Sequence, residues 1–551
     1  MNRMRRLPLP PLLLLALLAP HLAGCGAREE PQQGGPAGDG TPQRGGTVVT
    51  GWTTEPLGIN DLIFPTTAVG SEVHFRVFQH LVEEQPDFAE HPATFKPQLA
   101  ESWEWSDDHK VLTFHLRKNL VWSDGVPLTA EDVRWSWQAQ VHPAVAWDSA
   151  YMKEHIRDVE VVDPQTVRFH FTRVYAKQLL DANEGLILPK HAWSRLPFEK
   201  WRENGTWFFE NRLAAGPFRI ESWTAQQEMV LVRNERYWEK ERPYLDRVVL
   251  RFVPDASSLT TQLLNGEIDF IAQVSPADAK RVRERPELQV IPFWSNLFVA
   301  VAWNHSRPLF ADAEVRRALT LAIDRRSIVE TLWPGGTGRV GISPLLQSVW
   351  AHDKTLQPWP YDPAEARKIL AARGWKDGDG DGLLDRGGKK FSFELLSNAG
   401  NQARNDAAVM IQQQLRQVGI EATPRILEFN TLVADTRSGH FDAAITGATI
   451  DTSLDLSGNF HSRSIQDGDN FFRYSSPALD RLLDEAAGQK NIADAAPLLH
   501  QIEHQLHRDQ PVTFLWESQR LAAINRRVHD ARPNLQSAFF HLQDWWVSPR
   551  P

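Results

Sequence analysis

The first 26 residues constrain this chain more than any other segment, because they hold its only cysteine. They read MNRMRRLPLPPLLLLALLAPHLAGCG: three arginines lie in the first six positions, an apolar stretch follows, and small residues precede Cys25. This order is typical of an export signal, and the segment is too short and wrongly flanked for a transmembrane helix. An exported chain with one cysteine forms no internal disulfide, so its stability has to come from hydrophobic cores alone.

The segment around Cys25 also resembles the lipobox of bacterial lipoproteins, in which the cysteine is lipidated and becomes the mature N-terminus. We therefore expect a lipoprotein signal peptide over 1–24 and a lipid anchor on Cys25; the alternative is an ordinary signal peptide that ends by chance in cysteine. Residues 25–44 are polar and rich in Gly and Pro, which predicts a flexible tether. Acyl chains hold a protein durably on a bilayer, so the chain is expected on the extracytoplasmic face of the cell envelope, in the periplasm.

The charge balance and the absence of catalytic motifs exclude several function classes. The net charge of −9 becomes −12 once the three arginines of the signal are removed, so nucleic acid and anionic lipid are not expected as partners. The sequence contains no Walker loop, no Gly-x-Ser-x-Gly elbow and no HExxH pair, and a lipidated Cys25 is not available as a nucleophile. An enzyme would have to use unmarked carboxylate pairs, as a secreted hydrolase acting on sugars does.

After residue 45, strand-like runs alternate with amphipathic helices, which is the pattern of mixed α/β domains. In the stretch 111–137, alternating residues predict a strand, Ser-Asp-Gly at 123–125 predicts a turn, and Thr129 is the expected N-cap of a helix. At 551 residues the chain is long enough for two or three hydrophobic cores. The same capping signal predicts further helix starts at Asp312, Asp362 and Ser476.

A series of motifs, in order along the chain, resembles one protein family. Each motif is weak alone, but the series is specific, and the resemblance spans about residues 45 to 546. The family comprises the extracytoplasmic solute-binding proteins of ABC importers that bind dipeptides, oligopeptides or nickel (family 5). The motifs are PQLAESWE (97–104), WSDGVPLTAEDV (122–133), ILPKHAW (187–193), GPFRIESW (216–223), LVRNERYW (231–238), AWNHSRPLFADAEVRRALTLAIDR (302–325) and DQPVTFLWE (509–517).

The resemblance implies an α/β (mixed α+β) fold of two lobes, periplasmic-binding-protein-like, with an extra subdomain in lobe one and a ligand cleft at the hinge. Strand-like runs at 297–304 and 512–518 are expected to cross between the lobes. On this view the stretch 111–137 is structural, and its tryptophans serve packing. The expected divisions are 45–82, 196–305 and 512–551 for lobe one, 83–195 for the extra subdomain, and 306–511 for lobe two.

The same resemblance implies a function. The chain is expected to be a lipid-anchored receptor that captures peptides or a similar polar solute and delivers it to the permease and ATPase of an ABC importer. We expect a monomer that is not an enzyme and requires no cofactor. An oligosaccharide or nickel-chelate receptor of the same fold remains an alternative, and a secreted hydrolase is a more distant one.

The implied ligand-binding residues lie in TGATIDTSLDLSGNFHS (446–462). Peptide-binding members carry a Trp-x-x-Asp segment there, whose Asp pairs with the α-amino group of the ligand. Asp451 falls at the Asp position, Asp455 is a competing candidate, and Ala448 replaces the Trp. A carboxylate and an ammonium in a dry cleft form a charge-assisted bond worth roughly 1.5–3 kcal/mol. The missing Trp leaves sugars open as ligands, and a solvated or turn-capping Asp is the other interpretation.

One acidic loop has the spacing of a calcium site. Asp377, Asp379, Asp381 and Asp385 take positions 1, 3, 5 and 9 of a calcium-binding loop, with glycine at position 6. Hard carboxylate oxygens suit this hard cation. Position 12 is glycine rather than the usual bidentate Glu, and no flanking helices are predicted. A structural Ca²⁺ site and a solvated acidic hairpin therefore both remain open.

Overall fold

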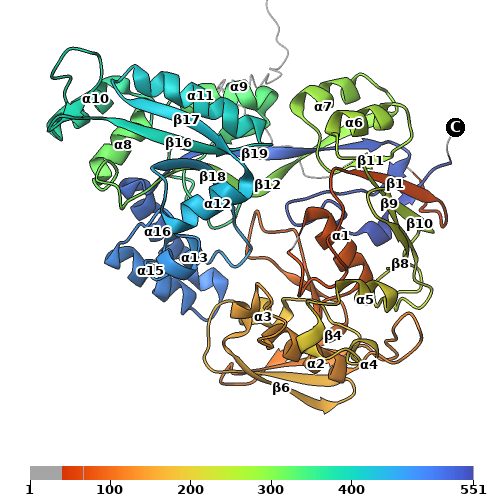
Figure 1. Cartoon of the computed structure of the whole chain (residues 1–551). Helices are drawn as coiled ribbons and strands as arrows, with labels where there is room; N and C mark the ends of the chain where they lie inside the picture. The colour runs from red at the N-terminus through yellow and green to blue at the C-terminus, as the bar shows by residue number, and fades with distance from the viewer. Residues whose placement is uncertain (1–39, 66, 550–551) are drawn as a thin grey trace, which may run out of the picture.

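The computed structural model describes residues 40–65 and 67–549. The expected signal peptide, Cys25 and most of the expected tether lie outside the described residues. Within the described part, no helix combines the length and the apolar character needed to cross a membrane. Figure 1 shows two lobes and a smaller subdomain below lobe one. The mixed α/β, two-lobe architecture expected from the sequence is confirmed.

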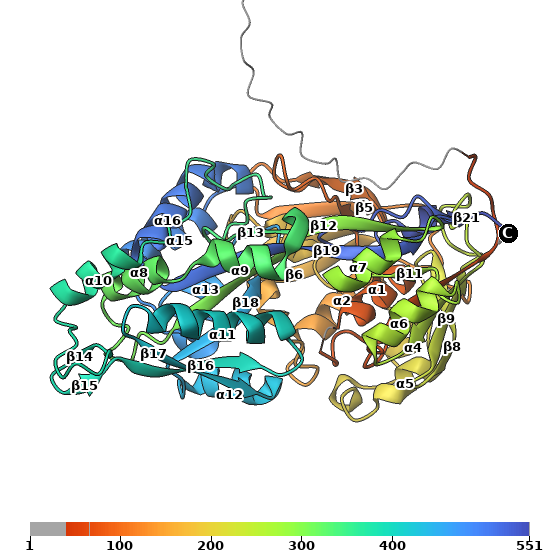
Figure 2. The same ribbon diagram turned by 90° about the horizontal axis from the view of Figure 1, so that it is seen from above.

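One eleven-stranded sheet runs through both lobes, and two long strands form its centre. These strands, β12 (Leu288–Trp303) and β19 (Val512–Asn525), pair antiparallel and cross from one lobe to the other (Figure 2). Their register is interrupted between Trp294 and Phe298, where the lobes meet. The lobe-two half of β12 is buried on both faces, which explains its continuous apolar sequence FVAVAW.

In lobe one the sheet continues from β19 through five more strands. Helix α1 (Ala68–Val77) packs on one face, and α6 (Ala256–Leu264) with α7 (Pro276–Arg283) covers the other. In order from β19 the strands are β11 (Phe270–Ile271), β1 (Thr47–Trp52), β10 (Arg247–Phe252), β9 (Glu228–Arg233) and β8 (Phe218–Thr224).

In lobe two the sheet continues from β12 through β18 (Ala443–Thr449), β16 (Ser392–Asn398) and β17 (Glu421–Leu427), while β13 (Gly338–Val340) pairs with β19. Four helices pack on one face: α8 (Ala313–Ala322), α9 (Arg325–Leu332), α10 (Pro363–Ala372) and α11 (Gln402–Arg416). Four others pack on the opposite face: α12 (Phe429–Ser438), α13 (Ser457–Phe460), α15 (Pro477–Ala487) and α16 (Ala496–Asp509).

The helix starts predicted in lobe two are confirmed. Asp312, Asp362 and Ser476 precede α8, α10 and α15, and each side chain accepts a hydrogen bond from a backbone N–H of the first turn. Such caps satisfy amide groups that have no partner inside the helix. Local sequence therefore fixes where these helices begin.

The extra subdomain contains a four-stranded sheet covered by α2 (Ala130–Val141). Its strands, in spatial order, are β4 (Ala100–Trp105), β5 (Val111–Leu116), β7 (Thr166–Phe171) and β6 (Ile156–Asp163). The predicted strand, turn and helix are β5, the Ser-Asp-Gly turn and α2. Thr129 and Asp132 form a capping box at the start of α2, and Trp122 and Trp135 are buried. This stretch is structural, as expected.

Short elements complete the chain. They are β2 (Val82–Glu84), β3 (Phe95–Pro97), the 3₁₀ helix η1 (Ala150–Lys153), α3 (Gln178–Asn183), α4 (Lys190–Trp193), η2 (Phe198–Lys200), α5 (Gly205–Glu210), η3 (Pro334–Gly336), β14 (Asp385–Arg386), β15 (Lys389–Lys390), α14 (Ser464–Asp467), η4 (Ile492–Ala495), β20 (Val528–His529), η5 (Leu542–Asp544) and β21 (Trp546–Val547).

Candidate functional site

The two lobes turn the carboxyl ends of their parallel strands toward each other. In lobe one, β1 runs parallel to β10 and β11; in lobe two, β16 runs parallel to β17 and β18. Because β11 is antiparallel to β19 and β18 is antiparallel to β12, both sets of strands end near the register break of the crossing pair. Ligands of open α/β sheets bind beyond the carboxyl ends of the strands. The candidate site is therefore the cleft between these edges.

The lobe-one edge carries a cavity of about 220 Å³ whose lining includes Trp52, Thr53, Gln273 and Arg520. Burial lowers the pKa of Arg520, which faces the charge of Glu72. Glu72 already accepts hydrogen bonds from the Ser537 hydroxyl (2.6 Å) and a backbone amide (2.6 Å), and no hydrogen bond joins it to Arg520 among the described residues. This guanidinium is therefore available to an anion in the cleft.

On the lobe-two edge, β18 exposes part of its backbone. Strand β16 pairs only with Ala443 and Ala444, so between Ile445 and Thr449 one edge of β18 has no strand partner among the described residues. Unpaired strand edges bind extended peptide segments through main-chain hydrogen bonds. Arg404 lies beside this edge and donates a hydrogen bond to Asn398 (3.1 Å). Burial lowers the pKa of Arg404.

Asp451 lies directly beyond this edge. One carboxylate oxygen accepts a hydrogen bond from the Ser453 amide (2.9 Å), and the side chain is exposed. The amide of Ile450 donates to Asn296 (2.9 Å) at the register break, which places Asp451 beside the hinge. The residue predicted to contact ligand therefore lies at the cleft, with one carboxylate oxygen accepting no hydrogen bond from the described residues.

Carboxyl groups of the extra subdomain face Asp451. Burial raises the pKa of Glu84, on β2, to about 7; a hydrogen bond from Thr452 opposes this shift, and the charges of Asp451 and Glu184 add to it. Burial also raises the pKa of Glu184 and, to about 6, that of Asp181 on α3. Like charges held together in a partly dry site attract a cation. Lys153 and Lys177 face the same cluster, but the carboxyl groups outnumber them, so the cleft beside Asp451 has an excess of acidic groups.

Large aromatic and apolar side chains are exposed on η1 and beyond strands of both lobes. Tyr151 of η1 is 65% exposed and faces the charges of Lys177 and Asp451. Leu57 follows β1 in lobe one and is 52% exposed, while Ile426 and Phe429, at the end of β17 in lobe two, are 55% and 53% exposed. Tyr151 thus places an exposed aromatic ring beside the charged cluster.

Asp455 occupies a different position from Asp451. Its carboxylate pairs with Lys177 of the extra subdomain at 3.2 Å, and both side chains are about three-quarters buried. Although burial acts in the opposite direction, this pairing raises the pKa of Lys177 and lowers that of Asp455. The second predicted ligand residue therefore joins lobe two to the subdomain.

The predicted calcium loop lies at the end of lobe two far from lobe one, next to β14 and β15 (Figure 2). Oxygen atoms of Asp377, Asp379 and Asp381 lie within 4.8 Å of one another. The ammonium of Lys390 pairs with Asp379 (2.6 Å) and Asp381 (2.9 Å), and Asp385 accepts the amide of Gly378 (3.0 Å). Three of the four predicted ligands thus come together around a lysine.

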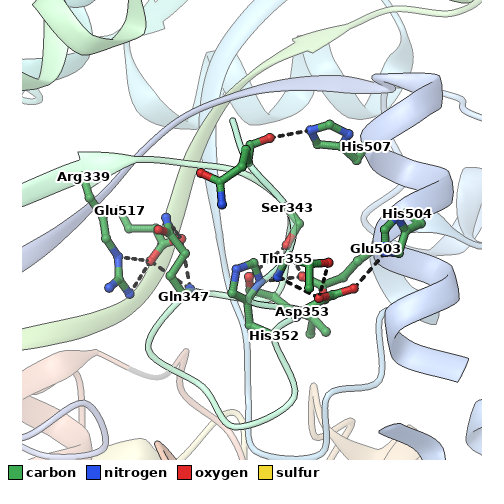
Figure 3. Close-up of polar contacts among 12 residues, drawn as sticks. Arg339, Ser343, Gln347, His352, Asp353, Thr355, Glu503, His504, His507 and Glu517 are labelled. Atoms are coloured by element: carbon green, nitrogen blue, oxygen red, sulfur yellow. Dashed lines mark hydrogen bonds and ion pairs between the residues drawn. The ribbon is translucent and has the colours of Figure 1, made fainter. Parts of the chain in front are cut away.

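Buried carboxylates hold the long loop between β13 and α10 of lobe two beside the hinge. Glu503 of α16 is fully buried and accepts hydrogen bonds from Ser343 (2.5 Å) and His352 (2.7 Å), and Glu517 of β19 pairs with Arg339 (2.8 Å) (Figure 3). No motif indicated these residues, because a glutamate on an amphipathic helix or strand usually faces solvent.

A side chain from the segment between β2 and β3 packs against this loop between β13 and α10. Phe88, between β2 and β3, is 1% exposed and packs in the lobe-two core with Leu345 and Val349. The Trp350 amide donates to the Phe88 carbonyl (3.1 Å). The segment 85–93, expected to belong only to the extra subdomain, therefore also contacts lobe two.

The chain is similar over its whole length to known binding proteins. Oligopeptide-binding protein AppA of Bacillus subtilis is 30% identical over 551 residues, covering 99% of both chains, and periplasmic oligopeptide-binding protein OppA of Escherichia coli is 28% identical, covering 77% of this chain and 79% of its own. The structure of B. subtilis AppA in complex with a nonapeptide has a TM-score of 0.78 and covers 92% of this chain and 100% of its own. NikZ from Campylobacter jejuni in complex with Ni(L-His), 23% identical, shares the fold with a TM-score of 0.77, covering 91% and 99%.

Two α/β lobes joined by two crossing strands, with their strand ends turned toward one cleft, define a bilobal solute-binding protein. The chain belongs to the bacterial extracellular solute-binding proteins, family 5, whose model ("family 5 Middle") matches residues 94–469. It is a solute-binding protein of the ABC importers and extracytoplasmic, and its family consists of binding proteins rather than enzymes.

Proposed function

We propose that this protein is a peptide receptor, which delivers peptides to the permease and ATPase of an ABC importer. The observation that carries the proposal is the position of Asp451, at the end of the unpaired edge of β18 and inside a cleft with an excess of acidic groups. An extended peptide has main-chain groups for the strand edge and an α-ammonium for the carboxylate. A charge-assisted bond of this kind is about twice as strong as a neutral one.

The two arginines at the cleft supply the opposite charge. Arg404 lies beside the β18 edge in lobe two, and Arg520 lines the cavity of lobe one. The Nε–H of Arg404 is buried and donates no hydrogen bond to any of the described residues. A peptide is a zwitterion, so anionic and cationic groups at separate places along the cleft suit its two ends. The oligopeptide-binding relatives support the same ligand class.

We further infer that a lipid on Cys25 attaches the receptor to the membrane, with residues 25–44 as its tether. The receptor acts as a monomer, without a required cofactor and without catalysis. Cys25→Ala should move the protein from the membrane fraction to soluble protein or unprocessed precursor. A normally processed variant that stays on the membrane after salt and carbonate washing contradicts the anchor.

The peptide assignment is tested by Asp451→Asn, which keeps the shape of the side chain and removes its charge. The ammonium would then be enclosed without its partner, at a cost of about 2–5 kcal/mol, or roughly 30- to several-thousand-fold in affinity. Dissociation constants are measured by calorimetry for a tripeptide mixture, for oligosaccharides and for a nickel–histidine chelate. Glu394→Gln, in an exposed ion pair of lobe two with Arg425, is the control.

Two outcomes contradict this proposal separately. If Asp451→Asn binds peptides as tightly as the wild type, Asp451 does not hold the ammonium. If the wild type binds a sugar or the nickel chelate tightly and binds no peptide, the peptide assignment fails and only the family fold remains.

A further inference from the structure

A second cavity, of about 310 Å³, opens on the lobe-two sheet next to Asp451. Its floor consists of small side chains on β12 and β18, and its walls are aromatic. The floor includes Ala300, Ala302 and Ala448, and the walls include Phe298, Phe460 and Phe471. Protein interiors are packed to the density of organic crystals, with few voids larger than a water molecule. A space of this size, lined by aromatic rings, small side chains and the threonines of β18, can hold a ligand side chain.

The position of Ala448 connects this cavity to the site of the proposed function. Ala448 pairs directly with Phe298 across the sheet, so both side chains point to the same face, where they line the cavity. It also lies on the unpaired edge of β18, three positions before Asp451. Three residues of strand span about 10 Å, so a peptide held at Asp451 brings one of its first three or four side chains to Ala448.

The chemistry of the lining selects the kind of side chain. The walls offer ring faces and edges, and aromatic pairs gain stabilisation beyond the area that they bury. The lining also has polar residues: Thr446 and Thr449 on β18, Asn459 on α13, and Asp469. Asp469 is exposed and pairs with Arg437 at 3.2 Å. The buried lining residues, Phe298 and Phe460, are apolar. A charged side chain would lose hydration against these rings, and the carboxylate of Asp469 in the lining is already paired with Arg437.

We propose that this cavity is a specificity pocket that takes one large apolar or aromatic side chain of the peptide, near its N-terminus. The inference rests on the proposed function and adds the class of peptide to it. Ala448 is the specificity-determining residue, because its small side chain keeps the cavity open at the edge of β18. Burial of one Phe side chain corresponds to roughly 10- to 100-fold in affinity over Ala at the same position.

The test compares four tripeptides: trialanine and its three variants with a single Phe at position 1, 2 or 3. Calorimetry should show that the wild type binds one of the Phe peptides roughly 10- to 100-fold more tightly than trialanine. Ala448→Trp fills the cavity and should remove this preference, which is measured as the ratio of the affinities for the Phe peptide and for trialanine. Ala448→Ser, which keeps the volume, should retain the preference, and Ala448→Leu, which fills less space and disturbs folding less, should reduce it.

The outcomes separate the two proposals. If the wild type binds all four peptides equally, or if both Ala448→Trp and Ala448→Leu keep the preference for Phe, the pocket assignment is overturned and the peptide receptor stands. If the wild type binds none of the four peptides under conditions where it binds another solute, the proposed function fails and the pocket assignment fails with it.

Discussion

The ion pair between Lys177 and Asp455 should control how easily the lobes close. It joins the extra subdomain to lobe two across the cleft, at a distance of 3.2 Å, and its side chains are 22% and 24% exposed. Because the two residues belong to different bodies, we expect the pair to form only when the lobes approach. Its coupling energy is therefore a contribution to closure rather than to the folding of either lobe.

The magnitude follows from this geometry. At 3.2 Å and an effective dielectric constant of about 20, the Coulomb attraction is about 5 kcal/mol, and desolvation of the two charges offsets most of it. Partly exposed pairs retain roughly 1–2 kcal/mol after this and after solvent screening. If the open form predominates without ligand, this energy corresponds to about 5- to 30-fold in apparent affinity.

A double-mutant cycle measures this coupling. Lys177→Met and Asp455→Asn remove the charges with little change of shape, and each should weaken trialanine binding and increase the radius of gyration in small-angle scattering with ligand present. The double variant should bind trialanine no more weakly than the worse single variant, and the loss of affinity should be smaller at high salt. Glu394→Gln is the matched control, since its pair with Arg425 (2.9 Å) lies within lobe two. If the losses of affinity in the two single variants add up in the double variant, or equal the loss in Glu394→Gln, the Lys177–Asp455 pair does not control closure.

Three other groups give expected outcomes. Burial raises the pKa of Glu84 from 4.5 to about 7, so its contribution to stability is full below about pH 4.5 and is lost as the pH rises through about 7. The melting temperature should therefore fall over this pH range, and it should fall less steeply for Glu84→Gln. Glu503→Ala leaves the donors of His352 and of the Asp353 amide without this partner and should lower the free energy of unfolding by about 3–5 kcal/mol, which is about 10 °C in melting temperature by calorimetry. Glu365→Gln, on an exposed helix face, should not. If the 377–385 loop binds Ca²⁺ by displacing Lys390, Ca²⁺ at about 100 times its dissociation constant should add about 2.7 kcal/mol to the free energy of unfolding. A melting temperature that changes with neither Ca²⁺ nor EDTA contradicts the metal site.

Local signals were enough to predict much of the scaffold. Thr129, Asp312, Asp362 and Ser476 were predicted as caps and are caps, because a capping side chain bonds to amides only two or three positions away. The two-lobe fold was predicted from the order of the family motifs, and no local physics would have placed β1 next to β10. Asp451 was predicted from the same resemblance, and its contact with ligand stays a prediction.

The surroundings of Asp451 could not be predicted in this way. Glu84, Asp181 and Glu184 come from the β2 and α3 regions and meet Asp451 only through the packing of the subdomain against lobe two. In the sequence each resembles an ordinary solvated carboxylate. The same holds for Glu503, whose burial depends on the path of the loop that it holds. A pKa shift depends on distances in space, which no spacing along the chain reports.

The groups at the lobe contact act against one another, and their balance explains why closure should require a solute. When the lobes meet, Glu84 and Glu184 come to face Asp451, and the energy of holding these charges together in a partly dry site opposes closure. The pair of Lys177 with Asp455 favours closure, and Lys177 also faces the charges of Asp181 and Asp451. Glu84 and Glu184 remain as further carboxyl groups around Asp451. Under the proposed function, a ligand ammonium at Asp451 would turn the repulsion among these carboxylates, which opposes closure, into attraction toward one cation, which favours closure. The ligand then binds the closed form more tightly than the open form, and this differential affinity is what a shift of the equilibrium requires.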